Sequence, residues 1–198
     1  METKIFGKYH ELALLTLGFI LTTVVGGGLG IYFQRQAWKQ QQLVEEKRIE
    51  RRSATQIFEE VSSLMDRRSY RMILLNWRLM HNSGLERTKA QMDEYRKILY
   101  EWNDSQNRNK ALIRRYFGSE MSSYFAKEIH GCFKQIGCHL EAYYATPLEE
   151  RSSEKGDKIG EDMGGLEEKI LEFNLKMMAL IQKEEIGMFH PEYREDAR

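Results

Sequence analysis

The sequence predicts an all-α protein with a single N-terminal transmembrane helix, a polar helical stalk and an antiparallel helical bundle. Only two of its 198 residues are proline, and Leu, Met, Glu, Lys, Arg and Gln are frequent, which favours helices. An uncharged run of 23 residues, 12–34, lies near the amino terminus. After it, apolar residues recur at spacings of three and four, the pattern of helices with one buried face.

The charge balance limits the classes of partner. Thirty Lys and Arg balance thirty Asp and Glu, so the formal net charge is zero. A chain that binds nucleic acid through bulk charge is expected to be basic. We therefore predict no nucleic-acid partner.

The run 12–34, LALLTLGFILTTVVGGGLGIYFQ, is predicted to be the transmembrane helix, preceded by a tail of residues 1–11. As a helix it is about 34 Å long, enough to cross a hydrocarbon core of about 30 Å. Glu11 and Arg35 bracket it, and Tyr32 falls at the interface, where aromatic residues concentrate. These features indicate a single-pass membrane protein.

The alternative for this segment is a cleaved signal peptide. Lys4 and Lys8 would form its charged region, and Gly26 or Gly28 would mark the cut. The apolar run continues through 29–33, beyond these glycines, which favours a retained anchor.

The orientation prediction rests on the basic residues that flank the span. The 18 residues after it carry six Lys or Arg, whereas the amino-terminal side carries Lys4, Lys8 and the terminal amine. Because Lys and Arg are in excess on the cytoplasmic side, we predict that the bulk of the chain is cytoplasmic. The opposite orientation stays open, since a short tail with two lysines also begins many anchors that start inside.

Gly26 and Gly30 form a GxxxG spacing within the span. Small residues on one face let two membrane helices approach closely, so this pair is a candidate helix-association face. The alternative is a flexible stretch near the interface, because glycine is common in such helices.

Residues 35–53 are too polar to pack on much and are predicted to be a solvated stalk. The bundle is predicted over 54–145, on the strength of two apolar stripes with helical spacing. The first stripe consists of Ile57, Val61, Leu64, Met72, Leu75 and Leu79. The second consists of Phe125, Ile129, Cys132, Ile136, Leu140 and Tyr143.

Helix boundaries are predicted from capping residues. Ser83 followed by Glu86 has capping-box spacing and should start a helix from about Leu85. Gly118 should end that helix, and Ser119 should cap the next.

The remainder of the chain is predicted to be less compact. Pro147 marks the start of a short helix within a mobile polar linker, 146–165, which contains RSSEKGDKIGEDMGG. A C-terminal helix follows over 166–186, and residues 187–198 should form a loose tail.

Three arginines, Arg67, Arg71 and Arg78, fall within about 40° of one another on the first bundle helix. They are a candidate contact for phosphate or lipid headgroups. The alternative is a solvated flank paired with Glu94 and Glu101, which face these arginines if the first two helices form an antiparallel hairpin.

The segment HGCFKQIGCH, residues 130–139, holds both cysteines. On a continuous helix, Cys138 is about 240° around from Cys132 and about 9 Å farther along the axis, which forbids a disulfide. No two of its His and Cys residues have the i, i+3 or i, i+4 spacing that places two ligands on one metal. We predict a helix with Cys132 buried, Cys138 flanking and no metal ligand, the alternative being a zinc site at a helix break.

No motif indicates catalysis or a cofactor. Glu-x-x-His, glycine-rich phosphate loops, HExxH and GxSxG are absent, so no catalytic, cofactor-binding or metal residues and no cofactor are predicted. We predict a membrane-anchored scaffold, adaptor or regulatory subunit that binds another protein or its own copies. The alternative is a signalling or effector protein that oligomerises through its transmembrane helix, and an enzyme of unrecognised type comes third. No small-molecule ligand is inferred.

Overall fold

The structure of the chain is a computed structural model. It describes residues 3–82 and 84–194, and the side chains of 14–82 and 84–193. Every regular element in these ranges is a helix, so the predicted all-α class is confirmed. The chain divides into two compact units, Met1–Arg48 and Ile49–Arg198.

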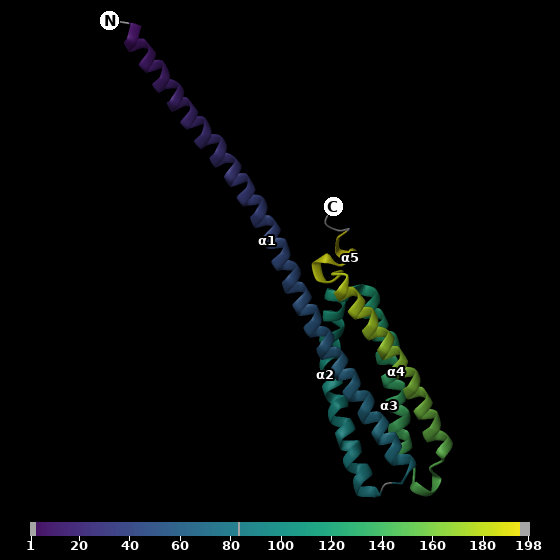
Figure 1. Ribbon diagram of the computed structural model, residues 1–198. Coiled ribbons are helices and arrows are strands. Elements are labelled where there is room, and N and C mark those ends of the chain that lie inside the picture. Colours follow the sequence, from purple (N-terminus) through teal and green to yellow (C-terminus); the bar gives the residue numbers. More distant parts are fainter. Residues whose placement is uncertain (1–2, 83, 195–198) are drawn as a thin grey trace. The chain divides into compact units, whose positions relative to one another are not determined.

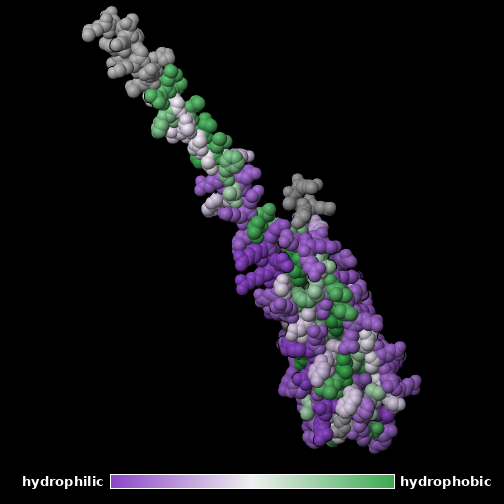
Figure 2. All heavy atoms as spheres, viewed as in Figure 1, coloured by the Kyte–Doolittle hydropathy of each residue, from purple (hydrophilic) through white to green (hydrophobic). Residues whose placement is uncertain are grey.

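Residues 3–48 of the first unit form the first part of α1, a helix with bounds Thr3–Met80. The predicted amino-terminal tail is therefore helical from Thr3. One stretch of α1 is long and apolar enough to cross a membrane, and none of it is buried within the structure. Figure 2 shows its hydrophobic side chains on the surface, where a membrane-spanning helix would meet lipid.

The second unit contains the last part of α1, residues 49–80, and all later elements (Figure 1). The longer elements are α2 (Leu85–Tyr124), α3 (His130–Ala145) and α4 (Ser153–Gln182). The short ones are a π-helical turn η1 (Phe125–Ile129), the 3-10 turns η2 (Leu148–Glu150) and η3 (Gly187–Phe189), and α5 (Pro191–Arg194).

Each long helix of this unit contributes one apolar stripe to a common core. On α1 the buried residues include the predicted Ile57, Val61, Leu64, Met72, Leu75 and Leu79. On α4 they are Ile159, Met163, Leu166, Ile170, Phe173 and Met177. Removal of these stripes from water is the main stabilising term for a helical domain of this kind.

Side-chain contacts show that neighbouring helices run in opposite directions. Along each pair, residue numbers rise on one helix as they fall on the other. The contacts are Glu60–Arg108, Arg67–Glu101 and Arg71–Glu94 for α1 and α2, Ser62–Asn174 and Asn76–Gly156 for α1 and α4, and Glu128–Lys169 and His139–Asp162 for η1–α3 and α4.

The path of α2 is interrupted at Gly118, as the sequence predicts. Its φ of 86° and ψ of 172° are accessible essentially to glycine alone. Helix resumes at once, and the backbone N–H of Ser119 donates to Glu192 Oε2 at 2.7 Å. Glu192 of α5 therefore caps this helical start. The other predicted cap, Ser83, lies outside the described residues.

The π-helical turn η1 changes which residue of the next stripe is buried. It closes with the His130 N–H bonded to the Phe125 carbonyl, so it holds one residue more than an α-helical turn. Beyond it Phe133 is fully buried, and Cys132, predicted to be buried, lies half-buried at the edge of the core. Phe133 therefore takes the core position predicted for Cys132, whereas Ile136, Leu140 and Tyr143 are buried as predicted.

Most of the segment predicted as a mobile linker, 146–165, is helical, because α4 begins at Ser153. The Ser152 side chain caps it by accepting from the Lys155 N–H. Gly156 is buried against α1, where an added Cβ would collide with Met80 Cγ, and its carbonyl accepts from Asn76 Nδ2 at 2.9 Å. Glycine here permits close helix packing instead of supplying flexibility.

The predicted loose tail, 187–198, is packed against the bundle over its described side chains, 187–193. Gly187, at a φ of 54°, lies directly against the Glu50 carboxylate, and the Tyr193 hydroxyl donates to the Arg114 carbonyl. Glu192 and Tyr193 thus satisfy two backbone groups near the Gly118 break, the Ser119 N–H and the Arg114 carbonyl. A composition-based prediction cannot detect such partners, because they belong to a distant part of the chain.

We predict that Gly118→Ala lowers the free energy of unfolding by about 1–3 kcal/mol, because this backbone conformation is strained for any residue with a Cβ. The added Cβ would also collide with the His190 ring. Gly131→Ala is the control, since nothing lies within 4 Å of its Cβ and it lies inside α3. It should keep or raise stability, by up to about 1 kcal/mol. Denaturation of the detergent-solubilised chain, followed by circular dichroism, measures both, and equal losses would contradict the prediction.

Candidate functional site

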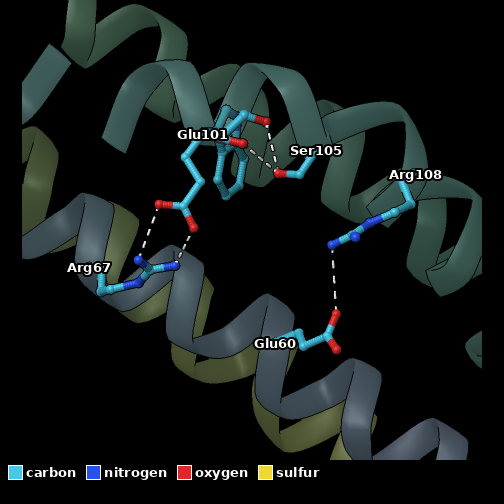
Figure 3. A network of polar contacts seen from close by, with 6 residues as sticks. Glu60, Arg67, Glu101, Ser105 and Arg108 are labelled. Carbon is cyan, nitrogen blue, oxygen red and sulfur yellow. Dashed lines mark hydrogen bonds and ion pairs between the residues drawn. The ribbon is translucent and has the colours of Figure 1, made fainter. Parts of the chain in front are cut away.

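A charged groove of about 690 Å³ runs between α1 and α2 and contains part of the predicted arginine stripe. Figure 3 shows Arg67 of α1 facing Glu101 of α2 through two hydrogen bonds, of 2.6 and 3.1 Å. Farther along, Arg108 lies 3.6 Å from Glu60. Both arginines that line the groove, Arg67 and Arg108, therefore lie beside a carboxylate, and the Arg67–Glu101 pair is bidentate.

The second arginine of the stripe, Arg71, lies 3.6 Å from Glu94. Lys97 also donates to Glu94 at 2.7 Å, and this hydrogen bond is the main cause that lowers the pKa of the Glu94 carboxyl. The pairing with Glu94 and Glu101 is thus present for two of the three arginines, and their positive charge is already compensated.

The third arginine, Arg78, is half-buried, and its Nε is buried without a hydrogen-bond partner. The proposed contact of Arg67, Arg71 and Arg78 with an anionic group remains a prediction. Gly26 and Gly30 lie on the exposed part of α1, with nothing within 4 Å of either Cβ position. Their role as a helix-association face also remains a prediction.

The cysteine-containing segment is helical, and both thiols are free. Lys169 Nζ lies 3.5 Å from Cys132 Sγ and 2.7 Å from Glu128, and the Glu128 hydrogen bond is the main cause that raises the pKa of Lys169. Cys138 is exposed. In the part of the chain that the structure describes, no three His, Cys, Asp or Glu side chains gather as metal ligands would.

A second surface feature, which the sequence analysis did not single out, lies on α1 and α4. Six large apolar side chains there are between 37% and 60% exposed, and we call them the apolar strip. Its members are Tyr70, Ile73 and Trp77 of α1, and Leu171, Leu175 and Met178 of α4. Figure 2 shows hydrophobic residues gathered between these two helices on a surface that is otherwise largely polar.

The strip borders a groove of about 370 Å³ between the two helices. Tyr70, Ile73 and Leu171 line it together with the acidic Asp66 and Glu167. Among the described residues no Lys or Arg lines this groove. Its chemistry is therefore apolar with an acidic edge.

The spacing of the strip was a signal available in the sequence. Its members recur at i, i+3, i+7 on α1 and at i, i+4, i+7 on α4, outside the stripes that fill the core. A helix with a second apolar stripe has more apolar surface than one core can bury. That excess is left exposed as the apolar strip.

The chain matches no known protein family, no curated protein and no solved structure.

We predict that the Arg67–Glu101 pair couples by less than about 1 kcal/mol, because both side chains are about half exposed and solvent screens their attraction. A double-mutant cycle of Arg67→Gln and Glu101→Gln, measured by denaturation of the solubilised chain, gives the coupling energy. Coupling above about 2 kcal/mol would assign this pair a structural role that an exposed ion pair does not normally have.

Proposed function

We propose that this chain is a membrane-anchored helical-bundle protein that docks a partner protein through the apolar strip of α1 and α4. In that role it serves as a scaffold, adaptor or regulatory subunit. The observation that carries the proposal is the strip itself, six exposed apolar side chains, of which Tyr70, Ile73 and Leu171 line a groove with an acidic edge.

The shape of the strip favours a helical ligand. Two antiparallel helices with apolar side chains on their outer faces form a shallow channel between them, and Tyr70, Ile73 and Leu171 border it. An amphipathic helix places its apolar face into such a groove through residues spaced three and four apart. Contiguous apolar surface with a polar rim is characteristic of protein-interaction sites.

The acidic edge favours a partner over a second copy of the chain. Asp66 and Glu167 would be complemented by Lys or Arg beside the apolar face of the incoming helix. If two copies met through this groove, their acidic residues would approach one another. The expected ligand is therefore an amphipathic helix with basic flanks, carried by another protein.

The candidate span supports membrane anchoring, and the six basic residues after it support a cytoplasmic bundle. Anchoring keeps the bundle at the membrane surface, where the encounter with another membrane-associated protein is confined to a thin layer. This raises the effective concentration of the two partners.

We predict that a reporter fused after Arg198 behaves as cytoplasmic and that the mature chain keeps residues 12–34. Topology assays with the fused reporter test the first statement. Mass spectrometry of the chain extracted from membranes tests the second. A chain beginning near Gly26 or Gly28 would establish a cleaved signal peptide, and a reporter outside the cytoplasm would reverse the orientation.

We predict that Tyr70→Ser with Leu171→Ser reduces partner recovery about tenfold or more, because buried aromatic and aliphatic anchors carry most of the energy of such interfaces. The measurement is affinity purification from solubilised membranes, with quantitative mass spectrometry of the co-purifying chains. Both residues are exposed, so the fold should persist, and circular dichroism verifies this.

The matched control is Leu85→Ser with Tyr100→Ser, which removes the same side-chain types from exposed positions on α2. The control should recover the same chains as the native protein. Equal recovery by all three proteins would exclude the strip as the docking surface.

A further inference from the structure

Arg68 of α1 is a cation inside the core of the bundle. It is 2% exposed and occupies the position on the core stripe between Leu64 and Met72. Its Nη2 donates to the Phe133 carbonyl at 3.3 Å, whereas Nε and Nη1 are buried without a hydrogen-bond partner. Burial of a charge with unsatisfied donors is costly unless something compensates it.

Two aromatic rings supply part of the compensation. The guanidinium carbon lies 5.0 Å from the Trp102 ring and 4.6 Å from the Phe133 ring, within the range of cation–π attraction. Desolvation is the main cause that lowers the pKa of Arg68, although a guanidinium remains protonated in proteins. Among the described carboxylates none forms an ion pair with Arg68. The positive charge is left without a counter-ion.

A cavity of about 310 Å³ reaches this residue between α1, α2 and α3. Apart from Arg68 and the apolar Leu99, its lining residues are Tyr95, Asn103, Gln106, His130, Lys134, Gly137, Cys138 and Glu141. Most of these side chains can donate hydrogen bonds, and Arg68 and Lys134 outnumber the single carboxylate of Glu141. The cavity is therefore cationic and rich in donors.

His130 contributes a donor in its neutral form. Trp102 Nε1 donates to His130 Nδ1 at 3.0 Å, so Nδ1 is the unprotonated nitrogen and Nε2 carries the proton. Desolvation, and then the charges of Arg68 and Lys134, lower the pKa of the His130 imidazole. The neutral tautomer is thus favoured near pH 7.

Gly137 allows the phenol of Tyr95 to lie beside the guanidinium. A Cβ at this position would lie 2.7 Å from the Tyr95 hydroxyl and 3.8 Å from Arg68 Nη2. Burial is the main cause that raises the pKa of Tyr95, so its hydroxyl stays protonated and can donate. The close approach of α3 thereby brings a neutral donor next to the charged one.

We infer that this cavity binds a small molecule through an oxyanion, a carboxylate or phosphate group that serves as the counter-ion of Arg68. Tyr95, His130 and Lys134 would complete the set of donors around it. A volume of about 310 Å³ matches a small molecule, because ligand cavities begin at about 300 Å³. The cavity is separate from the apolar strip, so the inference does not rest on the proposed partner.

The test uses the full chain in detergent, titrated with inorganic phosphate in one arm and with succinate in the other, against sodium chloride at equal ionic strength. A ligand that binds the folded state raises the apparent Tm, by about 3–6 °C at ten times its Kd. We expect a saturable rise with at least one of the two anions, and the arm with the lower Kd identifies the group. No rise beyond that of sodium chloride in either arm would overturn the inference.

Three variants assign the effect to the cavity. Arg68→Met should abolish the rise, and Lys134→Gln should weaken binding about two- to fivefold, as expected for an exposed charge. Lys127→Gln removes an exposed lysine that does not line the cavity and should bind as the native chain does. If Arg68→Met fails to fold, the Kd of Lys134→Gln still tests whether the anion binds in the cavity. An unchanged Kd in Lys134→Gln, or the same loss in Lys127→Gln, would overturn the inference.

Discussion

In the unit from Ile49 to Arg198, burial of one apolar stripe from each long helix in a common core is the interaction on which the other features depend. The stripes fix how each helix is rotated about its axis, and that rotation decides which side chains meet at the edges. Arg67 and Glu101 face one another because their helices are already packed, and their own attraction adds little. The same rotation leaves the apolar strip outside the core, exposed on the surfaces of α1 and α4.

Close backbone approaches make this packing possible at two places. Gly156 lets α4 lie against Met80 of α1, and Gly137 lets α3 lie against Tyr95 of α2. Neither glycine needs an unusual backbone conformation, since both lie inside helices. What matters at both positions is that glycine has no side chain, so the neighbouring helix can approach closely. The cost of a glycine in a helix, about 1 kcal/mol relative to alanine, is offset by the contacts that the close approach allows.

The apolar strip and the cavity at Arg68 are separate sites that offer different interactions to a ligand. The apolar strip offers hydrophobic area with an acidic edge, which suits a basic amphipathic helix. The cavity at Arg68 offers a desolvated cation and neutral donors, which suit a small oxyanion. Both involve α1, since Arg68 and Tyr70 are two residues apart and point to different sides of that helix. A ligand of the cavity and a partner on the strip would therefore act on one helix.

Helical class, the apolar span, the α1 core stripe and the break at Gly118 follow from the sequence, because periodicity and glycine conformation depend on near neighbours. The pairing of Arg67 and Arg71 with Glu101 and Glu94 also follows, since a hairpin fixes which residues face one another. Tertiary structure decided the rest. After the π-helical turn η1, Phe133 is buried in the core in place of Cys132. The glycine-rich segment is helical, and its Gly156 packs against α1. In the sequence, Arg68 is a polar residue at a position of the α1 core stripe, between Leu64 and Met72. The cavity beside it is lined by residues of three helices, α1, α2 and α3. Such contacts join residues far apart in the chain, so local sequence does not contain them.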